Sequence, residues 1–329
     1  MSITTLIVLL IIILCLSFGI TWLIKKIALR YKVMDIPNER SSHTIPTPRG
    51  GGLAIVIAWY LGITLIYFFG IIQANIFYAL LCGLLLAGIS LIDDVIDLKP
   101  IIRLGAQLIT VLGALYFLGG ITSIEILSLK FDSMILVPFT IIGMIWFINL
   151  YNFLDGIDAY ASIEAICVSM GLFLFTGNWI LLILIASILG FLFWNWPKAK
   201  IFMGDVGSTQ LGFVLVVLGI YFHNSHQFSI IHWIVLTAPF WFDATFTLYR
   251  RWRNNEKLSQ AHKKHAYQRI VQVGFSHLKT DLYLIIINII IFLLLLLSRH
   301  FELLIIPILL LTIILLYWLT KKIDKRKSF

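Results

Sequence analysis

Residues 75–100 read NIFYALLCGLLLAGISLIDDVIDLKP, an uncharged apolar run that ends directly in a cluster of carboxylates. The run from Asn75 to Ile92 is nearly long enough to cross a bilayer, which requires about 20 apolar residues, so the acids would lie at a membrane face. If the helix continues, Asp93 and Asp97 share one side of it and Asp94 lies about 100° round. The helix dipole and mutual repulsion disfavour the acids there. The cluster therefore favours a divalent cation with phosphate ligands over a solvated helix end.

The rest of the chain is equally apolar. Its 329 residues are 60% hydrophobic and 12% charged, whereas a soluble domain is about 25% charged. This composition excludes a soluble globular protein and predicts an all-α, polytopic membrane protein with one transmembrane domain over residues 1–329. The net charge of +9 then reflects membrane topology rather than nucleic-acid binding. Cys15, Cys82 and Cys167 lie in apolar runs without disulfide or metal spacing and are interpreted as packing residues.

Cations mark one side of the membrane. Of the 25 Lys and Arg residues, 23 lie in residues 25–50, 93–103, 196–207, 249–280 and the C-terminal tail. The positive-inside rule places these segments in the cytoplasm, with the N-terminus outside and the C-terminus inside. This matches eleven predicted spans, at residues 3–24, 52–71, 75–92, 104–120, 135–152, 161–176, 178–195, 208–222, 229–248, 281–298 and 302–320. The outer loop 121–134 alternates in part and predicts a small hairpin.

Two cytoplasmic motifs combine glycine with polar residues. The segment 48–52 reads PRGGG, and glycines at a helix entrance allow the backbone to approach a neighbour or a phosphate closely; a plain Gly/Pro linker is the alternative. The segment 149–158 reads NLYNFLDGID, in which Asn149, Asn152, Asp155 and Asp158 are spaced by three. A helix through them would gather these polar groups on one stripe, and a polar helix end with a glycine turn is the alternative.

Three further features lie on the same side. Asp205 in GDVGS (204–208) precedes a predicted helix whose free N–H groups suit a phosphate, while the carboxylate suits the accompanying metal; capping by Ser208 explains part of this pattern. Asp243 lies inside an apolar segment. It is interpreted either as a functional carboxylate or as the ion-pair partner of a nearby arginine. His262 and His265, at i and i+3, could bind a metal or a sugar phosphate, and the surrounding cations favour an anionic ligand.

Together these motifs resemble the polyprenyl-phosphate N-acetylhexosamine-1-phosphate transferases (glycosyltransferase family 4). The family includes the enzymes that start O-antigen and enterobacterial common antigen synthesis and the related phospho-MurNAc-pentapeptide transferase. The resemblance covers almost the whole chain and rests on PRGGG (48–52), the Asp93–Asp94 pair, NFLDGID (152–158), GDVGS (204–208) and the basic histidine loop. HKKHAYQR at 262–269 lacks the adjacent histidines of the peptidoglycan-precursor branch and looks like the O-antigen branch.

The resemblance implies that a lipid phosphate attacks the sugar-bearing phosphorus of a UDP-linked N-acetylated sugar, and that UMP leaves. It implies Mg²⁺ as cofactor, with Mn²⁺ as a substitute. The implied catalytic residues are Asp93, Asp94, Asp155 and Asp158, and the implied metal ligands are Asp205, Asn152 and Asp155. The implied substrate-binding residues are His43, Arg49, Asn149, Asn152, Gly204, His262, His265 and Arg269.

The expected setting follows from the same resemblance. The partners would be undecaprenyl (polyprenyl) phosphate, the UDP-sugar and membrane lipids, with no nucleic acid and with a homodimer as a further option. The site would be built from cytoplasmic loops 25–51, 93–103, 149–160, 196–208 and 249–280 of a multi-pass protein in the bacterial inner membrane.

Two alternatives remain at this stage. The first is the same chemistry with a muramyl-pentapeptide donor. The second is a membrane transporter, which would also combine many spans with carboxylates. Transporters tend to place such charges near the midplane on interrupted helices arranged in repeats. This chain shows no internal repeat and gathers its acids at one face, which favours the transferase.

Overall fold

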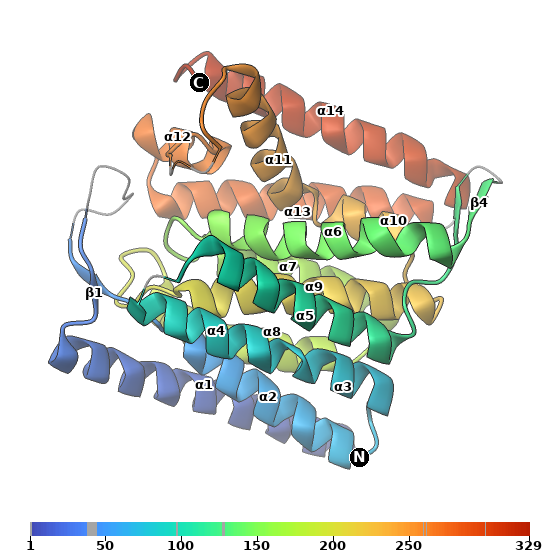
Figure 1. The fold of residues 1–329 in the computed structure, drawn as a ribbon, viewed down its shortest axis with the longest axis horizontal. Helices are drawn as coiled ribbons and strands as arrows, with labels where there is room; N and C mark the ends of the chain where they lie inside the picture. The colour runs from blue at the N-terminus through green and yellow to red at the C-terminus, as the bar shows by residue number, and fades with distance from the viewer. Residues whose placement is uncertain are drawn as a thin grey trace.

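The computed structural model describes residues 2–37, 45–96, 98–126, 129–258, 260, 262–299 and 301–329. Helices dominate this part of the chain, and most run along one common direction (Figure 1). The helices are α1 (Ile3–Tyr31), α2 (Gly52–Phe68), α3 (Ala74–Leu81), α4 (Gly83–Ile96), α5 (Pro100–Leu118), α6 (Ser133–Phe153), α7 (Tyr160–Thr176), α8 (Ile180–Asn195), α9 (Asp205–Asn224), α10 (Ile230–Leu236), α11 (Ala238–Arg253), α12 (Ala266–Gln272), α13 (His277–Ser298) and α14 (Ile305–Asp324).

Seven helical segments among the described residues are long and apolar enough to cross a membrane. They are α1, the combined α3–α4 segment Ala74–Asp94, α5, α6, α9, α13 and α14, and the shorter apolar helices α2, α7 and α8 lie beside them. The protein is therefore an all-α, multi-pass membrane protein, as the composition predicts. The predicted span 229–248 is divided into α10 and α11, because Pro239 cannot donate a backbone hydrogen bond and its ring crowds the preceding turn. Figure 1 shows α11 crossing the common helix direction.

Helix α9 forms the centre of the bundle. In the most apolar 18-residue stretch of α9, 94% of the residues are buried, whereas the corresponding share is 22% in α1 and in α14. Helix α9 contacts α2, α4, α6 and α7 among others. Glycines permit this close packing, since small residues let membrane helices approach each other. A Cβ at Gly52 of α2 would lie only 2.4 Å from the Gly207 Cα of α9. The central helix therefore presents its N-terminal residue, Asp205, in the middle of one end of the bundle.

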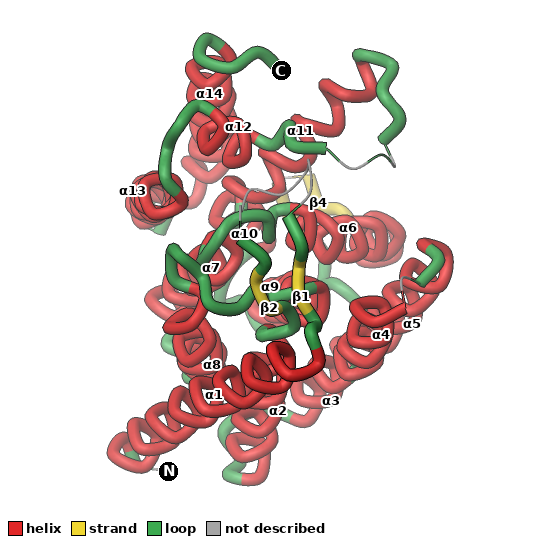
Figure 2. The backbone as a smooth tube through the Cα atoms, turned by 90° about the vertical axis from the view of Figure 1, so that its left-hand side faces the viewer, coloured by secondary structure: helices red, strands yellow, loops and turns green. Residues whose placement is uncertain are grey.

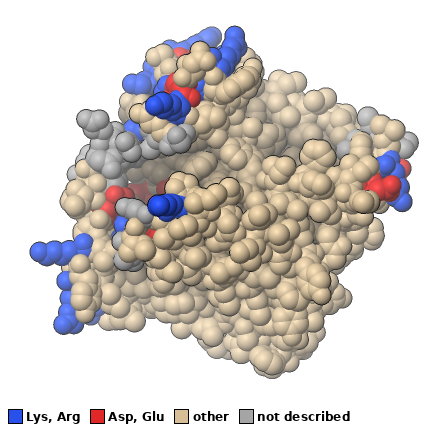
Figure 3. All heavy atoms as spheres, viewed as in Figure 1, with Lys and Arg blue, Asp and Glu red and all other residues tan. Residues whose placement is uncertain are grey.

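Two short hairpins lie at opposite ends of the helices (Figure 1). Strands β3 (Ile124–Ile126) and β4 (Leu129–Phe131) pair antiparallel, which confirms the hairpin predicted within residues 121–134. Strands β1 (Met34–Asp35) and β2 (Thr47–Pro48) pair at the other end. Figure 3 shows Lys and Arg gathered mainly at the end that carries β1, followed by a broad surface without charge. This distribution is that of a membrane protein with one strongly basic face.

Candidate functional site

The candidate site lies where α4 and α6 end and α9 begins. Figure 2 looks onto this end of the bundle. The PRGGG segment is held there by backbone hydrogen bonds, because the N–H groups of Gly51 and Gly52 donate to the carbonyls of Phe202 and Met203 at 2.9 and 2.8 Å. The Phe202 N–H donates to the Pro48 carbonyl at 2.8 Å. The glycine-rich entrance of α2 is thus joined to the loop that leads into α9, which supports the close-approach interpretation of these glycines.

Helix α9 begins earlier than the sequence suggests. Its N-cap is Gly204, with a positive φ of 77°, and Asp205 is its first residue. A side chain at Gly204 would be strained by this φ, and its Cβ would lie 3.2 Å from Asp94 Oδ2. The interpretation of Ser208 as the cap is wrong, because its hydroxyl lies inside the first turn and donates to the Gly204 carbonyl at 3.2 Å. The early start places the Asp205 carboxylate at the mouth of the site.

Three carboxylates converge there from different elements. Asp94 comes from the end of α4, Asp205 from the start of α9 and Asp155 from the turn after α6. Burial, followed by the neighbouring charge of Asp205, raises the pKa of Asp155 to about 8, and Asp94 and then Asp158 add to this effect. Figure 3 shows acidic side chains inside a hollow at this end of the molecule. The three carboxylates form a negatively charged pocket that a cation would stabilise.

Arg49 supplies one cation at the Asp94 side of this cluster. Its Nη2 donates to the Asp94 carbonyl at 2.6 Å, and its side chain also interacts with the Asp94 carboxylate. The backbone N–H groups of Asp205 and Val206 are directed at that carboxylate too. The N-terminus of α9, which the sequence assigns to a phosphate, therefore faces a carboxylate of the chain itself. An incoming phosphate would have to share this electropositive position with Asp94.

Asn152 and Ser208 orient the third carboxylate. The Asn152 side-chain amide donates to Asp205 Oδ1 at 2.9 Å and to the Ser208 hydroxyl at 3.0 Å. Asn152 therefore acts on Asp205 through its amide hydrogens, and its carbonyl oxygen is left to face other groups. From the sequence alone, Ser208 is interpreted only as a helix cap. Its position one turn beyond Asp205 in GDVGS is the signal that predicts a side chain on the same face.

Two of the predicted catalytic carboxylates have protein partners. Asp93 is buried, and its oxygens accept from the Leu98 N–H at 2.7 Å and from Arg103 Nη1 at 3.0 Å. Asp158 Oδ2 accepts from the N–H groups of Lys198 and Ala199 and lies 3.1 Å from His277 Nδ1.

The pKa of Asp158 reflects these partners. Burial raises this pKa, but the hydrogen bonds outweigh burial, with His277 contributing most, and hold the pKa below its usual value. The contacts of Asp93 and Asp158 stabilise the loops around the site, and the catalytic roles of these two residues stay predictions.

The helix through Asn149 and Asp158 does not form. Helix α6 ends at Phe153, so Asp155 and Asp158 lie in the following turn. This turn has no room for a side chain at Gly156, because the Tyr267 hydroxyl lies only 2.1 Å from where a Cβ would be. Asn149 remains on α6 and exchanges hydrogen bonds with Gln107 of α5, at 2.8 and 3.2 Å. Asn149 thus faces α5, whereas Asn152 faces Asp205.

The basic loop between α11 and α12 is folded around Arg251, which is only 2% exposed. Arg251 pairs with Glu256 and donates to three loop carbonyls, those of Lys257, Leu258 and Gln260. Glu256 also pairs with Lys264 at 2.5 Å. Arg251 and Lys264 therefore share one carboxylate within the loop itself.

The histidines of this loop lie together, as their spacing predicts. The rings of His262 and His265 are 4.8 Å apart. Burial first, and then the neighbouring His265, lowers the pKa of His262 to about 4, so its ring is neutral near pH 7. His265 Nδ1 lies 3.7 Å from Asp243 Oδ1, which also accepts from the Ala266 N–H at 2.8 Å. Asp243 therefore anchors the start of α12 rather than pairing with an arginine.

Arg269 is buried and points away from the loop surface. Its Nη2 pairs with Asp324 Oδ1 at 2.7 Å and donates to the Lys327 carbonyl. Asp324 also pairs with Arg250 at 2.9 Å. These contacts tie α11 and α12 to the end of α14, and the substrate-binding role of Arg269 stays a prediction. His43 and Asp97 lie outside the described residues.

The residues present fit a magnesium ion. Among the described residues, no three His, Cys, Asp or Glu side chains lie close enough to hold an ion by themselves. Mg²⁺ usually takes only one or two protein carboxylates and completes its shell with waters and substrate phosphates. Asp94 Oδ2 is buried without a hydrogen-bond partner in the described part of the chain, and Asp205 lies beside it. Two neighbouring carboxylates are as many protein ligands as such an ion would need.

Comparison with known proteins agrees with this geometry. The model of the family described as glycosyl transferase family 4 matches residues 76–223, which include Asp94, Asp155 and Asp205. A probable undecaprenyl-phosphate N-acetylglucosaminyl 1-phosphate transferase of Bacillus subtilis is 32% identical over 284 residues, covering 82% of this chain and 78% of that protein.

Two further relatives have similar names. An undecaprenyl-phosphate alpha-N-acetylglucosaminyl 1-phosphate transferase of Thermotoga maritima is 30% identical over 261 residues, which cover 77% of this chain and 79% of that protein. A decaprenyl-phosphate N-acetylglucosaminephosphotransferase of Mycobacterium leprae is 28% identical over 312 residues, with 82% and 77% coverage. The carboxylate cluster and this extended similarity lead to one conclusion, that the chain belongs to glycosyl transferase family 4.

Proposed function

We propose that the protein transfers an N-acetylated amino-sugar-1-phosphate from a UDP-sugar to undecaprenyl (polyprenyl) phosphate and releases UMP. The observation that carries this proposal is the convergence of Asp94, Asp155 and Asp205 with Arg49 at the N-terminus of α9. Such a site suits groups that are themselves phosphates and that bring a cation with them. The names of the relatives support the acceptor and the sugar, since each joins a polyprenyl phosphate to N-acetylglucosamine phosphate.

The chemistry follows from the charges. An oxygen of the lipid phosphate attacks the sugar-bearing phosphorus of the donor, and the bond from that phosphorus to UMP breaks. No strong general base is required, because a phosphate monoester is already largely ionised near neutral pH. Positioning and charge neutralisation therefore supply most of the catalysis.

Each residue of the cluster has a definable part in this reaction. Arg49 offsets negative charge beside Asp94, and Asn152 with Ser208 fixes the rotamer of Asp205. Asp94 and Asp205 would hold Mg²⁺, which when bound supplies the positive charge that brings two phosphate groups together. Asp155, with its raised pKa, can hold a proton at its carboxyl until positive charge enters the site.

The biological setting of the proposal is the initiating step of O-antigen or related surface polysaccharide synthesis. The basic end of the molecule (Figure 3) would then face the cytoplasm, with an N-terminus outside and eleven crossings in the inner membrane. A water-soluble nucleotide sugar could reach the cluster from that side, while the lipid phosphate arrives at headgroup depth. Cysteine labelling tests the orientation, since reaction of a cysteine at position 255 or 325 from outside intact cells would contradict it.

A labelled donor tests the bond that breaks. With a UDP-sugar carrying ³²P in the β-phosphate, the label should appear in the lipid product and added UMP should reverse the reaction, because one phosphoanhydride is exchanged for another. Release of labelled UDP would show ordinary glycosyl transfer instead.

A matched pair of variants tests the site. Asp205→Asn should abolish turnover, whereas Asp132→Asn, an exposed acid before α6 at the other end of the bundle, should leave turnover unchanged. Full turnover by Asp205→Asn, or undiminished activity in EDTA, would reject the assignment.

A further inference from the structure

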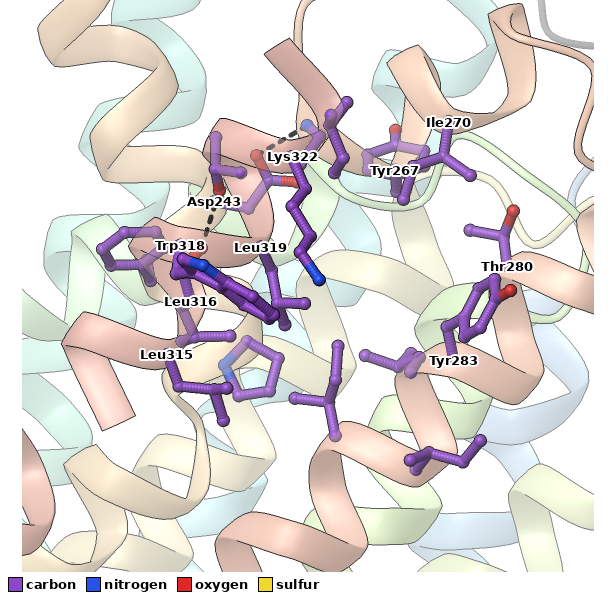
Figure 4. A pocket seen from close by; sticks show the side chains of 18 of the residues that line it. Asp243, Tyr267, Ile270, Thr280, Tyr283, Leu315, Leu316, Trp318, Leu319 and Lys322 are labelled. Atoms are coloured by element: carbon purple, nitrogen blue, oxygen red, sulfur yellow. Dashed lines mark hydrogen bonds between the residues drawn. The ribbon is translucent and has the colours of Figure 1, made fainter. Parts of the chain in front are cut away.

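A large apolar groove lies outside the carboxylate cluster, between α11, α12, α13 and α14. Its volume is about 810 Å³, within the range of about 300–1,000 Å³ that is typical of ligand sites. Figure 4 shows Leu315, Leu316 and Leu319 from α14 and Tyr283 from α13 lining it. Tyr283, Ile286, Ile290 and Trp318 line the groove and are also 40–51% exposed. The groove therefore opens on the outer surface of two candidate spans, where bilayer hydrocarbon is the surrounding medium.

Three cations lie around this groove at the end of α14. Lys322, Lys325 and Arg326 all belong to its lining. Figure 4 shows the Lys322 side chain extending into the groove, and its ammonium lies 3.5 Å from the centre of the Trp318 ring. The Arg326 guanidinium lies 5.6 Å from the ring of Phe275, another lining residue. Two of the three positive groups are thus held against the apolar walls by aromatic rings.

These cations differ from their neighbours in lacking acidic partners. Arg250 and Arg269 share Asp324, and Arg251 and Lys264 share Glu256. Among the described residues, no carboxylate forms an ion pair with Lys322, Lys325 or Arg326. A fixed positive charge beside an apolar groove at headgroup depth attracts an anionic amphiphile.

One acid, Asp243, also lines the groove, but the net charge of the lining stays positive. Asp243 Oδ1 accepts from the Ala266 N–H and from the Thr247 hydroxyl, at 2.8 and 3.1 Å. Its Oδ2 has no partner in the described part of the chain. With three cations and this one acid, the lining carries an excess of two positive charges.

The inner wall separates the groove from the reaction site. Tyr160 and Tyr267 line the groove, stack with their rings 4.7 Å apart and are 7% and 1% exposed. The Tyr267 hydroxyl donates to the Phe153 carbonyl at 3.2 Å, at the start of the turn that carries Asp155. A phosphate beside Lys322 would therefore lie behind this wall and would not face Arg49 or Asp94. This geometry favours a resident lipid over the reacting acceptor.

We propose that the groove between α11 and α14 binds an anionic phospholipid of the surrounding bilayer. Its acyl chains fill the apolar groove, and its phosphate lies among Lys322, Lys325 and Arg326. The bound lipid packs against Tyr267 and so stabilises α12 and the turn behind it. This site is independent of the transferase chemistry, and its occupancy can be measured without turnover.

Native mass spectrometry of the full-length protein in detergent tests the proposal. We expect phosphatidylglycerol to be retained and phosphatidylcholine to be lost, and phosphatidylglycerol alone to raise the thermal midpoint. Each cation near a membrane surface strengthens anionic lipid binding about fivefold, so Lys322→Gln with Arg326→Gln should weaken retention about 25-fold. Lys327→Gln is the matched control, because this exposed cation of the same tail does not line the groove. Elution of each variant at the wild-type volume on gel filtration excludes misfolding.

Three outcomes would overturn the proposal. Equal retention of the two lipids would remove the charge argument. A fivefold loss in Lys327→Gln, the loss expected for each cation removed from the groove, would make the effect one of net charge. Displacement of phosphatidylglycerol by undecaprenyl phosphate, with a raised KM for that acceptor in the double variant, would assign the groove to the acceptor instead.

Discussion

The crossing of α2 and α9 gives the sharpest prediction, because the substitution Gly52→Ala adds one methyl group where the two backbones touch. The added Cβ would lie 2.4 Å from Gly207 Cα and 2.8 Å from Gly207 N. Carbon atoms in ordinary contact are about 3.5–4.0 Å apart, so the helices must separate by about 1 Å or more. The obstacle is backbone, which cannot rotate away as a flexible side chain can. The start of α9, and with it Asp205, must therefore move.

The Gly52→Ala substitution should lower both the stability and the turnover of the protein. Overpacking a closely packed interior costs about 1–3 kcal/mol of folding free energy, which thermal unfolding in detergent would record as a lower midpoint. A displacement of about 1 Å at a catalytic group can reduce turnover about 100-fold, and UMP release measures this loss. We expect turnover to fall much more than stability, because Asp205 lies only two residues before the contact. Gly207→Ala, whose Cβ would lie 2.7 Å from Gly52 Cα, should act in the same direction.

Gly88→Ala is the matched control. Gly88 lies inside α4, is exposed and has nothing within 4 Å of an added Cβ. Removing a glycine from such a helical position stabilises it by about 0.5–1 kcal/mol, so this variant should unfold at or above the wild-type temperature with full turnover. Equal stability and equal turnover for Gly52→Ala and Gly88→Ala would refute the close contact of α2 with α9 as the element that places Asp205.

Three further predictions concern the surrounding residues. Hydrogen bonds from His277 and the 198–199 backbone hold the pKa of Asp158 below 3.8 despite burial. The ionised form of Asp158 therefore stabilises the fold above that pH, and this stabilisation is lost as the pH falls through the folded-state pKa. His277→Gln should raise the acid midpoint of unfolding, and an unchanged midpoint would argue against the pair. Since burial and His265 lower the pKa of His262 to about 4, its ring is neutral near pH 6.5, so a transition in the pH–rate profile near 6.5 that disappears in His262→Gln would contradict this burial. Arg49→Lys keeps the charge but loses the forked donor that reaches the Asp94 carbonyl. A hydrogen bond made by a charged group contributes about 1.5–3 kcal/mol to stability, so this variant should lower the thermal midpoint as well as kcat; wild-type values of both would show that charge alone suffices.

Much of the architecture was predictable from local sequence. Uncharged apolar runs predict helices, since a bilayer offers backbone groups no other hydrogen-bond partners. Alternation in 121–134 predicts the β3–β4 hairpin, and the glycines at 50–52 predict a close approach of backbones. Spacing alone also predicts that His262 and His265 lie together. Each of these inferences depends on residues within a few positions of one another.

The site itself depended on packing between distant segments. Asp93 and Asp94 are adjacent in sequence, yet Asp93 turns to Arg103 while Asp94 faces Asp205, because successive helical residues point about 100° apart and only one can face α9. Arg269 belongs to the basic loop by sequence but is paired with Asp324, 55 residues away. Composition and periodicity therefore determined the membrane class, most of the helices and the set of candidate acids. Only the tertiary structure decided which acids share the site, because that choice depends on which helix faces come into contact around α9.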